Sequence, residues 1–334
     1  MATPASLLNA SAPAVASRLP NDRWRPLEIA FWLIPVIAFF LFPNYRVLGS
    51  QVLITGLFAV SLDLILGYAG IVSLGHAAFF GIGAYVAGLL AVHGWNEPIS
   101  GLLLAAVVSA IAGYLASFLV VRGGDLARLM VTLGIELMLW EAANKASSIT
   151  GGVDGLSGVT ISRIFGIWGF DIGGSTAFVY ALVVVFVVFV LLRRLVHSPF
   201  GLSLRGIREG GRRMPAIGAP VGKRLRAIFT VAAAVAGVAG ALLAQTTQFV
   251  GIDTLGFPRS AELMIMLVLG GTGRLYGGLV GAAIYMIAQD YLSGIDPVYW
   301  QFWIGFFLVV IVLFAHGGVL GGLATLRARM KVSP

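Results

Sequence analysis

Residues 193–226 read RRLVHSPFGLSLRGIREGGRRMPAIGAPVGKRLR, a basic stretch that lies between two apolar runs. It holds nine of the chain's 22 Lys and Arg residues and a single acidic residue, Glu209. Charges at this density belong in water, whereas the apolar runs on either side belong in lipid. The stretch therefore predicts a hydrophilic loop between two membrane-spanning helices, and it indicates a fold in which other apolar runs span the membrane as well.

Apolar and basic residues separate within this stretch at helical spacing. The apolar side comprises Leu204, Ile207, Met214 and Ile217, and the basic side comprises Arg205, Arg208, Arg212 and Arg213. This pattern predicts an amphipathic segment that lies along a membrane surface. Gly210, Gly211 and Pro215 disfavour one continuous helix, because relative to Ala an interior glycine costs about 1 kcal/mol and an interior proline about 3 kcal/mol. We expect two short helices joined at the glycines.

Two interpretations of the basic loop remain open at this point. It is either an interfacial loop held by anionic lipid, at about 1 kcal/mol per cation near the surface, or a docking element that receives a push from a cytoplasmic motor. The rest of the chain has to decide between them.

Composition defines the broad class. The chain has 334 residues, of which 59% are hydrophobic and 11% charged, against about 25% charged in a soluble domain. We therefore expect an all-α integral membrane protein. The absence of cysteine excludes disulfides and thiolate metal sites. The net charge of +8 is explained by membrane topology, with no need for a nucleic-acid partner.

Ten apolar segments approach the roughly 20 residues that a helix needs to cross a hydrocarbon core. The shortest segment, Pro258–Gly271, has only 14 residues and contains Arg259 and Glu262, so a re-entrant or broken helix is an alternative there. The ten segments are Leu27–Asn44, Ser50–Tyr68, Val72–His93, Ile99–Val121, Ala127–Ser148, Ser175–Val196, Arg226–Val250, Pro258–Gly271, Tyr276–Ser293 and Val298–His316.

The distribution of basic residues predicts the orientation. With ten spans and both termini in the cytoplasm, the loop 193–226 and the terminal basic cluster fall inside, as the positive-inside bias requires. We accordingly expect a cytoplasmic tail at residues 1–26, a transmembrane domain at 27–316 with a cytoplasmic coupling segment at 203–218, and a second cytoplasmic tail at 317–334. Residues 1–26 lack the apolar core of a signal peptide.

Glycine is abundant, with 44 residues, and two short motifs echo one another. Residues 66–70 read LGYAG and residues 269–273 read LGGTG, and each is followed by a glycine-rich helix. Transporters are often built from such repeats, with broken helices beside the substrate route. Other small residues, such as Gly273, Gly277 and Gly281, recur every four residues and predict close helix packing.

Polar residues within the apolar segments are candidates for a transport pathway, because a charge at the bilayer centre costs at least about 2.5 kcal/mol. The candidates are Asp63, His76, Glu136 and Glu262. A hydrogen-bonded structural role is the alternative for each, above all for His76. Glu141 and Lys145 are four residues apart on one helix and are expected to pair, and Asp290 lies near a span end.

Enzymatic signatures are absent from the sequence. There is no GxxxxGK[ST] phosphate loop, no HExxH metal motif and no GxSxG nucleophile motif. We therefore expect no catalytic residue and no metal site, and a protein that is not an enzyme. If ATP drives this protein, another chain binds it.

Four blocks of sequence resemble the permease subunits of ATP-binding-cassette importers for branched-chain amino acids, the LivM type. They are LGYAGIVSLGHAAFFGIGAYVAGLL (66–90), TGGVDGLSGV (150–159), GIREGGRRMPAIGAP (206–220) and LGGTGRLYGGLVGA (269–282). The blocks lie in the order that the family has and span roughly residues 50–316. The third resembles the motif that docks on the ATPase, which favours the docking interpretation of the basic loop.

This resemblance implies the partners and the residues of the coupling loop. The expected partners are a homologous permease subunit, two cytoplasmic ATP-binding subunits that use ATP and Mg, and an extracytoplasmic solute-binding protein, assembled at a bacterial inner membrane. Arg208, Glu209 and Gly218 match the docking motif, and nearby basic residues extend it. The full expected coupling set is Arg205, Arg208, Glu209, Arg212, Arg213, Gly218 and Lys223.

The sequence departs from the family pattern at several positions. Gly210 and Gly211 replace an Asn-Glu pair, and Asp63 stands where the family usually has Asn. The expected cargo is a branched-chain or other hydrophobic amino acid, with urea, amides or aromatic acids as alternatives. An ion-coupled carrier that uses Glu136, Glu262 or Asp63 is the alternative from another class.

Overall fold

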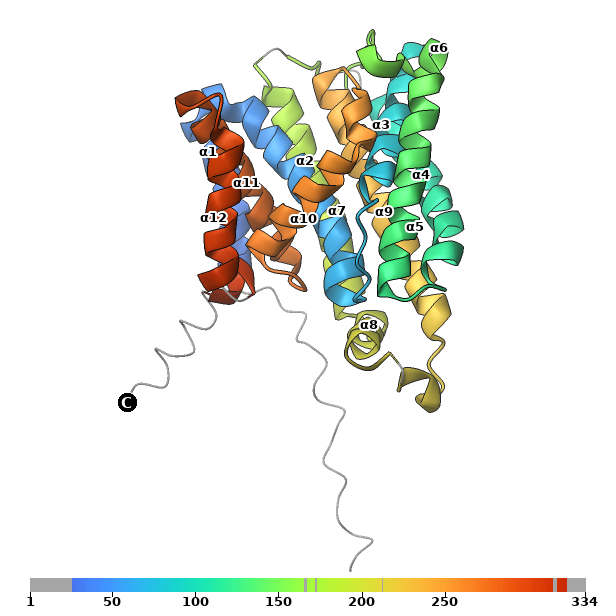
Figure 1. The fold of residues 1–334 in the computed structure, drawn as a ribbon. Coiled ribbons are helices and arrows are strands. Elements are labelled where there is room, and N and C mark those ends of the chain that lie inside the picture. Colours follow the sequence, from blue (N-terminus) through green and yellow to red (C-terminus); the bar gives the residue numbers. More distant parts are fainter. Residues whose placement is uncertain (1–25, 165–166, 172, 212, 315–316, 323–334) are drawn as a thin grey trace, which may run out of the picture.

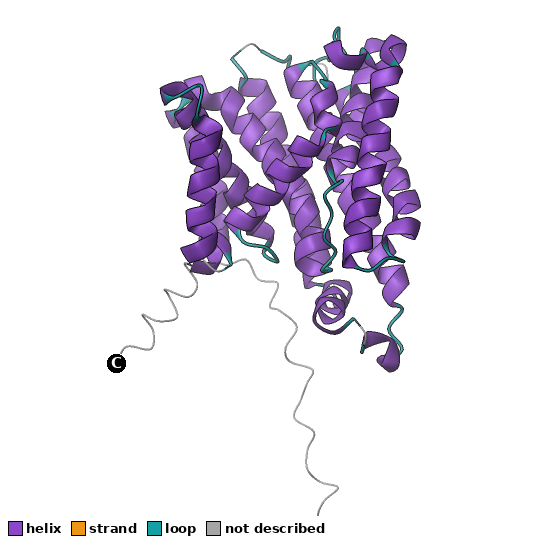
Figure 2. Ribbon diagram, viewed as in Figure 1, coloured by secondary structure: helices purple, strands orange, loops and turns teal. Residues whose placement is uncertain are grey.

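The computed structural model describes residues 26–164, 167–171, 173–211, 213–314 and 317–322. These residues are mainly helical (Figure 2) and include no β-strand, which confirms the predicted all-α class. The α-helices are α1 (Pro26–Leu41), α2 (Arg46–Asp63), α3 (Ala77–Val92), α4 (Pro98–Val120), α5 (Asp125–Lys145), α6 (Ser147–Thr150), α7 (Ser175–His197), α8 (Pro199–Gly210), α9 (Val221–Thr247), α10 (Phe257–Gly270), α11 (Leu275–Ile295) and α12 (Trp300–Phe314).

Among the described residues, four helical segments are long and apolar enough to cross a membrane, or five if α10 and α11 count as one bent span. The four are Pro43–Tyr68, Pro98–Val120, Ser175–His197 and Val221–Thr247. One face of α4 exposes large apolar side chains at every fourth position, as expected of a face that meets lipid: Leu103, Val107, Ile111, Leu115 and Leu119. The chain is a multi-pass membrane protein, while the count of ten spans and the orientation stay predictions.

Helices α2 and α9 form the centre of the bundle. Every residue of α2 from Leu53 to Asp63 is buried, and α9 packs against both α3 and α4. Small residues make these contacts close. Gly237 on α9 faces Ser109 on α4, and Gly281 on α11 lies against the backbone of Met266 on α10. The glycine ladders therefore pack the interior of this chain.

The predicted helix over Val72–His93 is wrong in its first part. Helix α2 continues into the π-helical turn η4 (Leu64–Tyr68), and residues 69–76 are then non-helical before α3 begins at Ala77. Figure 2 shows this segment as a long loop that runs between the helices. Non-helical backbone is tolerated at membrane depth only where protein surrounds it, and Ile71, Ser73 and Gly75 are buried.

Tertiary contact determines this break. Gly75 lies so close to the carbonyl group of Thr132 on α5 that a Cβ atom there would overlap it. The non-helical segment thus occupies a space beside α5 that a helix with side chains would not fit. The sequence pattern contains no signal of this contact, because the partner residue is 57 positions away.

Helix α10 begins at the same level as α3 and runs in the opposite direction. At the common junction, the backbone N–H of Ala77 donates a hydrogen bond of 2.9 Å to Ser260 Oγ. From there α3 runs toward Leu156 and Val250, which contact Gly88, whereas α10 runs toward Gly271. Two half-length helices therefore meet at their N-termini inside the bundle.

Helix α10 joins α11 through a bend of 112°. Gly271 and Gly273 in this bend have positive φ angles of 106° and 76°, which residues with a side chain rarely adopt. The short predicted segment Pro258–Gly271 is thus the first of two helices, α10 and α11, separated by a sharp bend. This corresponds to the broken-helix alternative derived from the sequence.

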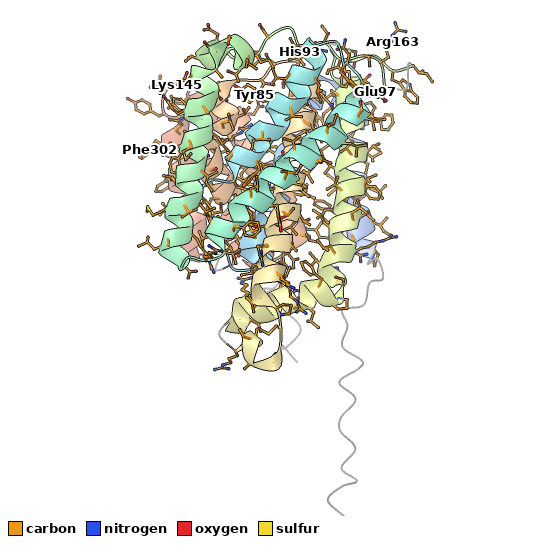
Figure 3. The ribbon with its side chains drawn as sticks, turned by 90° about the vertical axis from the view of Figure 1, so that its right-hand side faces the viewer. Tyr85, His93, Glu97, Lys145, Arg163 and Phe302 are labelled. Atoms are coloured by element: carbon orange, nitrogen blue, oxygen red, sulfur yellow. The ribbon has the colours of Figure 1, made fainter. Side chains whose placement is uncertain are left out.

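Helix α8 lies at one end of the bundle (Figure 1), and the described chain begins and ends there as well. Glu28 of α1 pairs at 3.1 Å with Arg193 in the last turns of α7, which leads into α8. Gly318, which follows α12, lies against Gly271 at the bend. The opposite end holds His93, Glu97 and Arg163 (Figure 3). The predicted tails fall almost wholly outside the described residues.

Candidate functional site

The basic loop folds as the sequence predicts, in two short helical pieces. Helix α8 begins after Ser198 with Pro199 in its first turn, a position where proline's missing N–H costs nothing. It ends at Gly210, and a single 3-10 turn, η6, covers Met214–Ile217. Leu204 and Ile207 are buried, which confirms the inward face of α8.

The inward face does not continue into η6 as predicted. Ile217 is 76% exposed, and only Met214 returns to the protein, where its Sδ faces Gly206 of α8. The turn between the pieces resets the helical phase, so the spacing counted through Gly211 does not carry over. Arg213, Pro215, Ala216, Ile217 and Gly218 are exposed, and we call residues 213–218 the tip.

Arg208 connects α8 to the two glycine motifs. Its Nη1 donates a hydrogen bond to the carbonyl oxygen of Gly67. A Cβ atom on Gly70 would lie 3.1 Å from Arg208 Cγ, and one on Gly273 would lie 2.9 Å from Arg208 Nη1. The side chain of Arg208 therefore lies across both LGYAG and LGGTG, which are about 200 residues apart in the sequence.

Asp63 joins the same two motifs from the inside. It is fully buried at the end of α2, and its Oδ1 accepts a hydrogen bond of 2.7 Å from the backbone N–H of Gly273. Gly67 lies one turn further along and touches Gly273 directly. We call this set, Asp63, Gly67, Arg208 and Gly273, the clamp. The two similar motifs, LGYAG and LGGTG, thus contact each other next to α8.

The other predicted coupling residues surround the clamp and the tip. The guanidinium group of Arg205 lies 5.3 Å from the ring centre of Tyr68, so Arg205 also contacts the η4 turn. Glu209 and Lys223 are exposed, and Arg212 lies outside the described residues. Arg193 corrects the expectation that all charges of the stretch lie in water, because its side chain is 6% exposed and pairs with Glu28.

A second cluster of polar residues lies where α3 and α10 meet, around the carboxyl group of Glu136 on α5. Glu136 is fully buried, and its Oε1 accepts a hydrogen bond of 2.9 Å from Ser260 Oγ. The same hydroxyl oxygen accepts the N–H of Ala77. We call Glu136, Ser260 and Ala77 the junction. Ala77 is the first residue of α3, and Ser260 lies in the first turn of α10, so the junction connects Glu136 to the start of both helices.

Further polar side chains lie next to the junction in the chain. His76 precedes Ala77, and its Nε2 lies 2.8 Å from Ser61 Oγ on α2. Thr132, one turn before Glu136, accepts a 3.4 Å hydrogen bond from the N–H of Leu74. Four buried atoms on residues at or next to the junction in the chain have no hydrogen-bond partner within the described residues: Ser73 Oγ, His76 Nδ1, Glu136 Oε2 and Arg259 Nε.

The predicted pathway residues thus fall into three places. Glu136 and His76 lie at or beside the junction, Asp63 belongs to the clamp, and Glu262 pairs at 3.4 Å with Arg259 on its own helix. Glu141 and Lys145 pair at 3.2 Å as expected, away from the junction. Sequence reasoning missed Ser260, because a lone hydroxyl in a short segment carries no pattern.

The fold and these two sites define a class of protein, a multi-pass helical membrane protein whose half-helices meet inside the bundle. A family model described as "Branched-chain amino acid transport system / permease component" matches residues 46–315. The chain belongs to this family of transport permeases. The resemblance inferred from the four sequence blocks is thereby confirmed.

Individual relatives agree with the family. The chain is 28% identical over 298 residues to a high-affinity branched-chain amino acid transport system permease protein LivM of Salmonella typhimurium, covering 82% of this chain and 69% of that protein. The LivM protein of Escherichia coli is 28% identical over 78% of this chain and 66% of its own length. The LivH permease of Escherichia coli is 25% identical, over 79% of this chain and 90% of its own length. No solved structure matches the chain.

Proposed function

We propose that the chain is the membrane permease subunit of an ATP-binding-cassette importer for branched-chain or other hydrophobic amino acids. The complex has two ATP-binding subunits, one of which docks on α8 and the tip. A homologous permease subunit packs beside the chain, and a solute-binding protein delivers the cargo on the other side of a bacterial inner membrane. ATP and Mg are bound by the partner subunits. The family and the names of the relatives support this proposal.

One structural observation carries the docking part, namely that an exposed basic segment is joined directly to the interior through Arg208. The tip presents Arg213 and Ile217 to the outside, and α8 sits on the clamp. Ile217 is 76% exposed within this chain, so lipid or a protein partner has to cover it, and the resemblance of residues 206–220 to the motif that docks on the ATPase favours the protein partner. An exposed apolar side chain among arginines suits a protein partner.

The clamp suggests how a push on α8 reaches the transport route. Gly67 leads through residues 69–76 to Ala77, and Gly273 follows α10, which carries Ser260. Both ends of the junction are therefore linked to Arg208 through short stretches of backbone. A displacement of α8 moves the two half-helices together, which is the kind of two-state element that coupling requires.

Charge reversal at the tip tests this function. The chain is expressed with candidate ATP-binding subunits from the same organism, and Arg213→Glu with Ile217→Glu is compared with Arg163→Glu, an exposed arginine at the opposite end (Figure 3). We expect the tip variant to lose co-purification and ATP-driven import, whereas the Arg163 variant keeps both. A tip variant that retains full assembly and import would remove the docking proposal.

A further inference from the structure

The junction contains an acceptor that the protein leaves unused. Glu136 Oε1 is bonded to Ser260, but Oε2 is buried and has no partner within the described residues. A carboxyl group that served only to connect α5 to α10 would need one oxygen. Lipid supplies no water to satisfy the other, and an unsatisfied polar group there costs several kcal/mol.

The surroundings define the group that fits this oxygen. Glu136 Oε2 is a hydrogen-bond acceptor with no donor among the described residues. A carboxyl oxygen in this state is a suitable partner for a cationic hydrogen-bond donor such as an ammonium group. Nearby in the chain, Ser73 Oγ and His76 Nδ1 are also without partners. Ser61 Oγ donates to the carbonyl oxygen of Phe58 and therefore accepts from His76 Nε2, so that Nδ1 of the neutral ring is a further acceptor.

The side chains around the junction are apolar. Phe79 and Phe80 follow Ala77 in the first turn of α3, Leu263 follows Ser260 by one turn of α10, and all three are buried. Leu255, which precedes α10, lies against Gly81 of α3. An apolar side chain of a solute would thus find apolar neighbours beside the polar group.

We propose that Glu136 is the binding residue for the ammonium group of the transported amino acid, at the point where α3 and α10 meet. The ammonium group donates to Oε2, and the apolar side chain of the solute lies against the buried Phe79, Phe80 and Leu263. This inference rests on the proposed transport function and gives the permease its own selection for an amino group. The junction is enclosed in this structure, so the solute enters only when α10 moves relative to α5.

Three variants separate the charge of Glu136 from its hydrogen bond. Glu136→Gln keeps the shape and the bond to Ser260 but removes the charge, and Glu136→Asp keeps the charge on a shorter side chain. Ser260→Ala removes the bond alone. The matched control is Glu141→Gln, on the same helix but paired on the surface with Lys145. Each is assembled with all partner subunits and reconstituted in vesicles, and leucine uptake is measured.

We expect Glu136→Gln to lower kcat/KM for leucine by at least about tenfold, which corresponds to about 1.4 kcal/mol. Glu136→Asp should restore part of this loss, Ser260→Ala should raise KM with a smaller effect on kcat, and Glu141→Gln should stay within about twofold of the unsubstituted complex. A melting curve and size-exclusion profile of each complex verify assembly.

A binding experiment separates recognition of the ammonium group from a structural role. Radiolabelled leucine is bound to the complex without its solute-binding protein, and 3-methylbutylamine and 4-methylpentanoate, which lack the carboxylate and the amine respectively, are used as competitors. We expect the amine to compete better than the acid, and the Glu136→Gln complex to lose this preference.

Several results would overturn the inference. They are equal competition by amine and acid in the unsubstituted complex, no saturable leucine binding by a complex that imports leucine, or unchanged uptake by Glu136→Gln. In each case import by the unsubstituted complex leaves the proposed function intact. If the unsubstituted complex imports no amino acid with its partners present, the proposed function fails first.

Discussion

The backbone N–H of Gly273 donates a 2.7 Å hydrogen bond to Asp63 Oδ1, across 210 positions of sequence. This bond joins the end of α2 to the bend between α10 and α11, directly beneath Arg208. Both segments lead to the meeting point of the half-helices. The bond therefore fixes the end of α2 against the α10–α11 bend, at the end of the bundle where α8 lies.

Replacement of Asp63 tests whether this bond stabilises the fold. Asp63→Ala leaves the N–H of Gly273 without its acceptor, and loss of an intramolecular hydrogen bond costs about 0.5–1.5 kcal/mol. Asp63→Asn keeps an oxygen acceptor, which agrees with the asparagine that the resembling family usually has there. We expect thermal stability in detergent to fall for the alanine variant and to stay close to the original for asparagine. Equal stability of the alanine and asparagine variants would show that the bond contributes nothing.

Close backbone approach at Gly67 gives a second prediction. A Cβ atom there would overlap both Asp63 Oδ1 and the backbone nitrogen of Gly273. Because the neighbour is backbone, it cannot move aside cheaply, and we expect Gly67→Ala to lower the yield of folded protein severely. Gly222→Ala is the control, since a Cβ there meets nothing within 4 Å at the start of α9. Size-exclusion chromatography after detergent extraction measures both, and a normal yield for Gly67→Ala would contradict the geometry of the clamp.

We expect Arg208 to transmit the motion of α8 to the transport route rather than to hold the ATP-binding subunits. Arg208 and Arg213 are both exposed, but the guanidinium group of Arg208 is bonded to the carbonyl oxygen of Gly67 in the clamp. We expect Arg208→Ala to keep the ATP-binding subunits bound while the amount of solute imported per ATP hydrolysed falls by about tenfold, within the range expected when a residue between two coupled sites is replaced. Simultaneous measurement of uptake and phosphate release in vesicles checks this ratio. Loss of the ATP-binding subunits in this variant would instead assign Arg208 to the docking surface.

A pH effect is expected at the start of α7, outside the membrane-spanning helices. Asp171 accepts hydrogen bonds from the N–H groups of Thr176 at 2.9 Å and Ser175 at 3.3 Å. The bond from Thr176, above all, lowers the pKa of Asp171 below its usual value. A lowered pKa stabilises the fold above the unfolded pKa of about 3.9, and this contribution is lost as the pH falls through the folded value.

Hydrogen exchange measures this effect directly. We expect the first amides of α7 to lose protection below about pH 4, and Asp171→Ala to remove the pH dependence by exposing them already at neutral pH. The first turn of α4 is the reference, because no side chain caps it. Protection at α7 that responds to acid no more than α4 does would argue against the role of Asp171.

The sequence predicted the helical class and the general position of most helices, because long apolar runs have few other solutions in a membrane. It also predicted that the basic loop would break at its glycines. It did not predict the non-helical residues 69–76, since the cause is contact between Gly75 and Thr132 on another helix. The same holds for the meeting of Gly67 with Gly273. Periodicity failed at Ile217 because the turn before it changes the helical phase.

Candidate site residues divided in a similar way. Glu136 was found because a carboxyl group in an apolar run is costly wherever it lies. Its partner Ser260 and the N–H of Ala77 could not be identified, since their contribution depends on two helix ends brought together from distant parts of the chain. Arg193 was assigned to water because of its basic neighbours, although Glu28 of α1 is its partner. Pairwise contacts of this kind leave no trace in a single sequence.

The measurement that tests the account most directly is solute uptake by vesicles that contain the purified chain alone or assembled with its partner subunits. With partners, we predict leucine uptake that requires ATP in the compartment that α8 faces. This uptake should persist when proton and sodium gradients are dissipated. The chain alone should accumulate nothing. Accumulation by the chain alone, driven by a proton or sodium gradient and abolished by Glu136→Gln, would contradict the ATP-driven mechanism and establish an ion-coupled carrier.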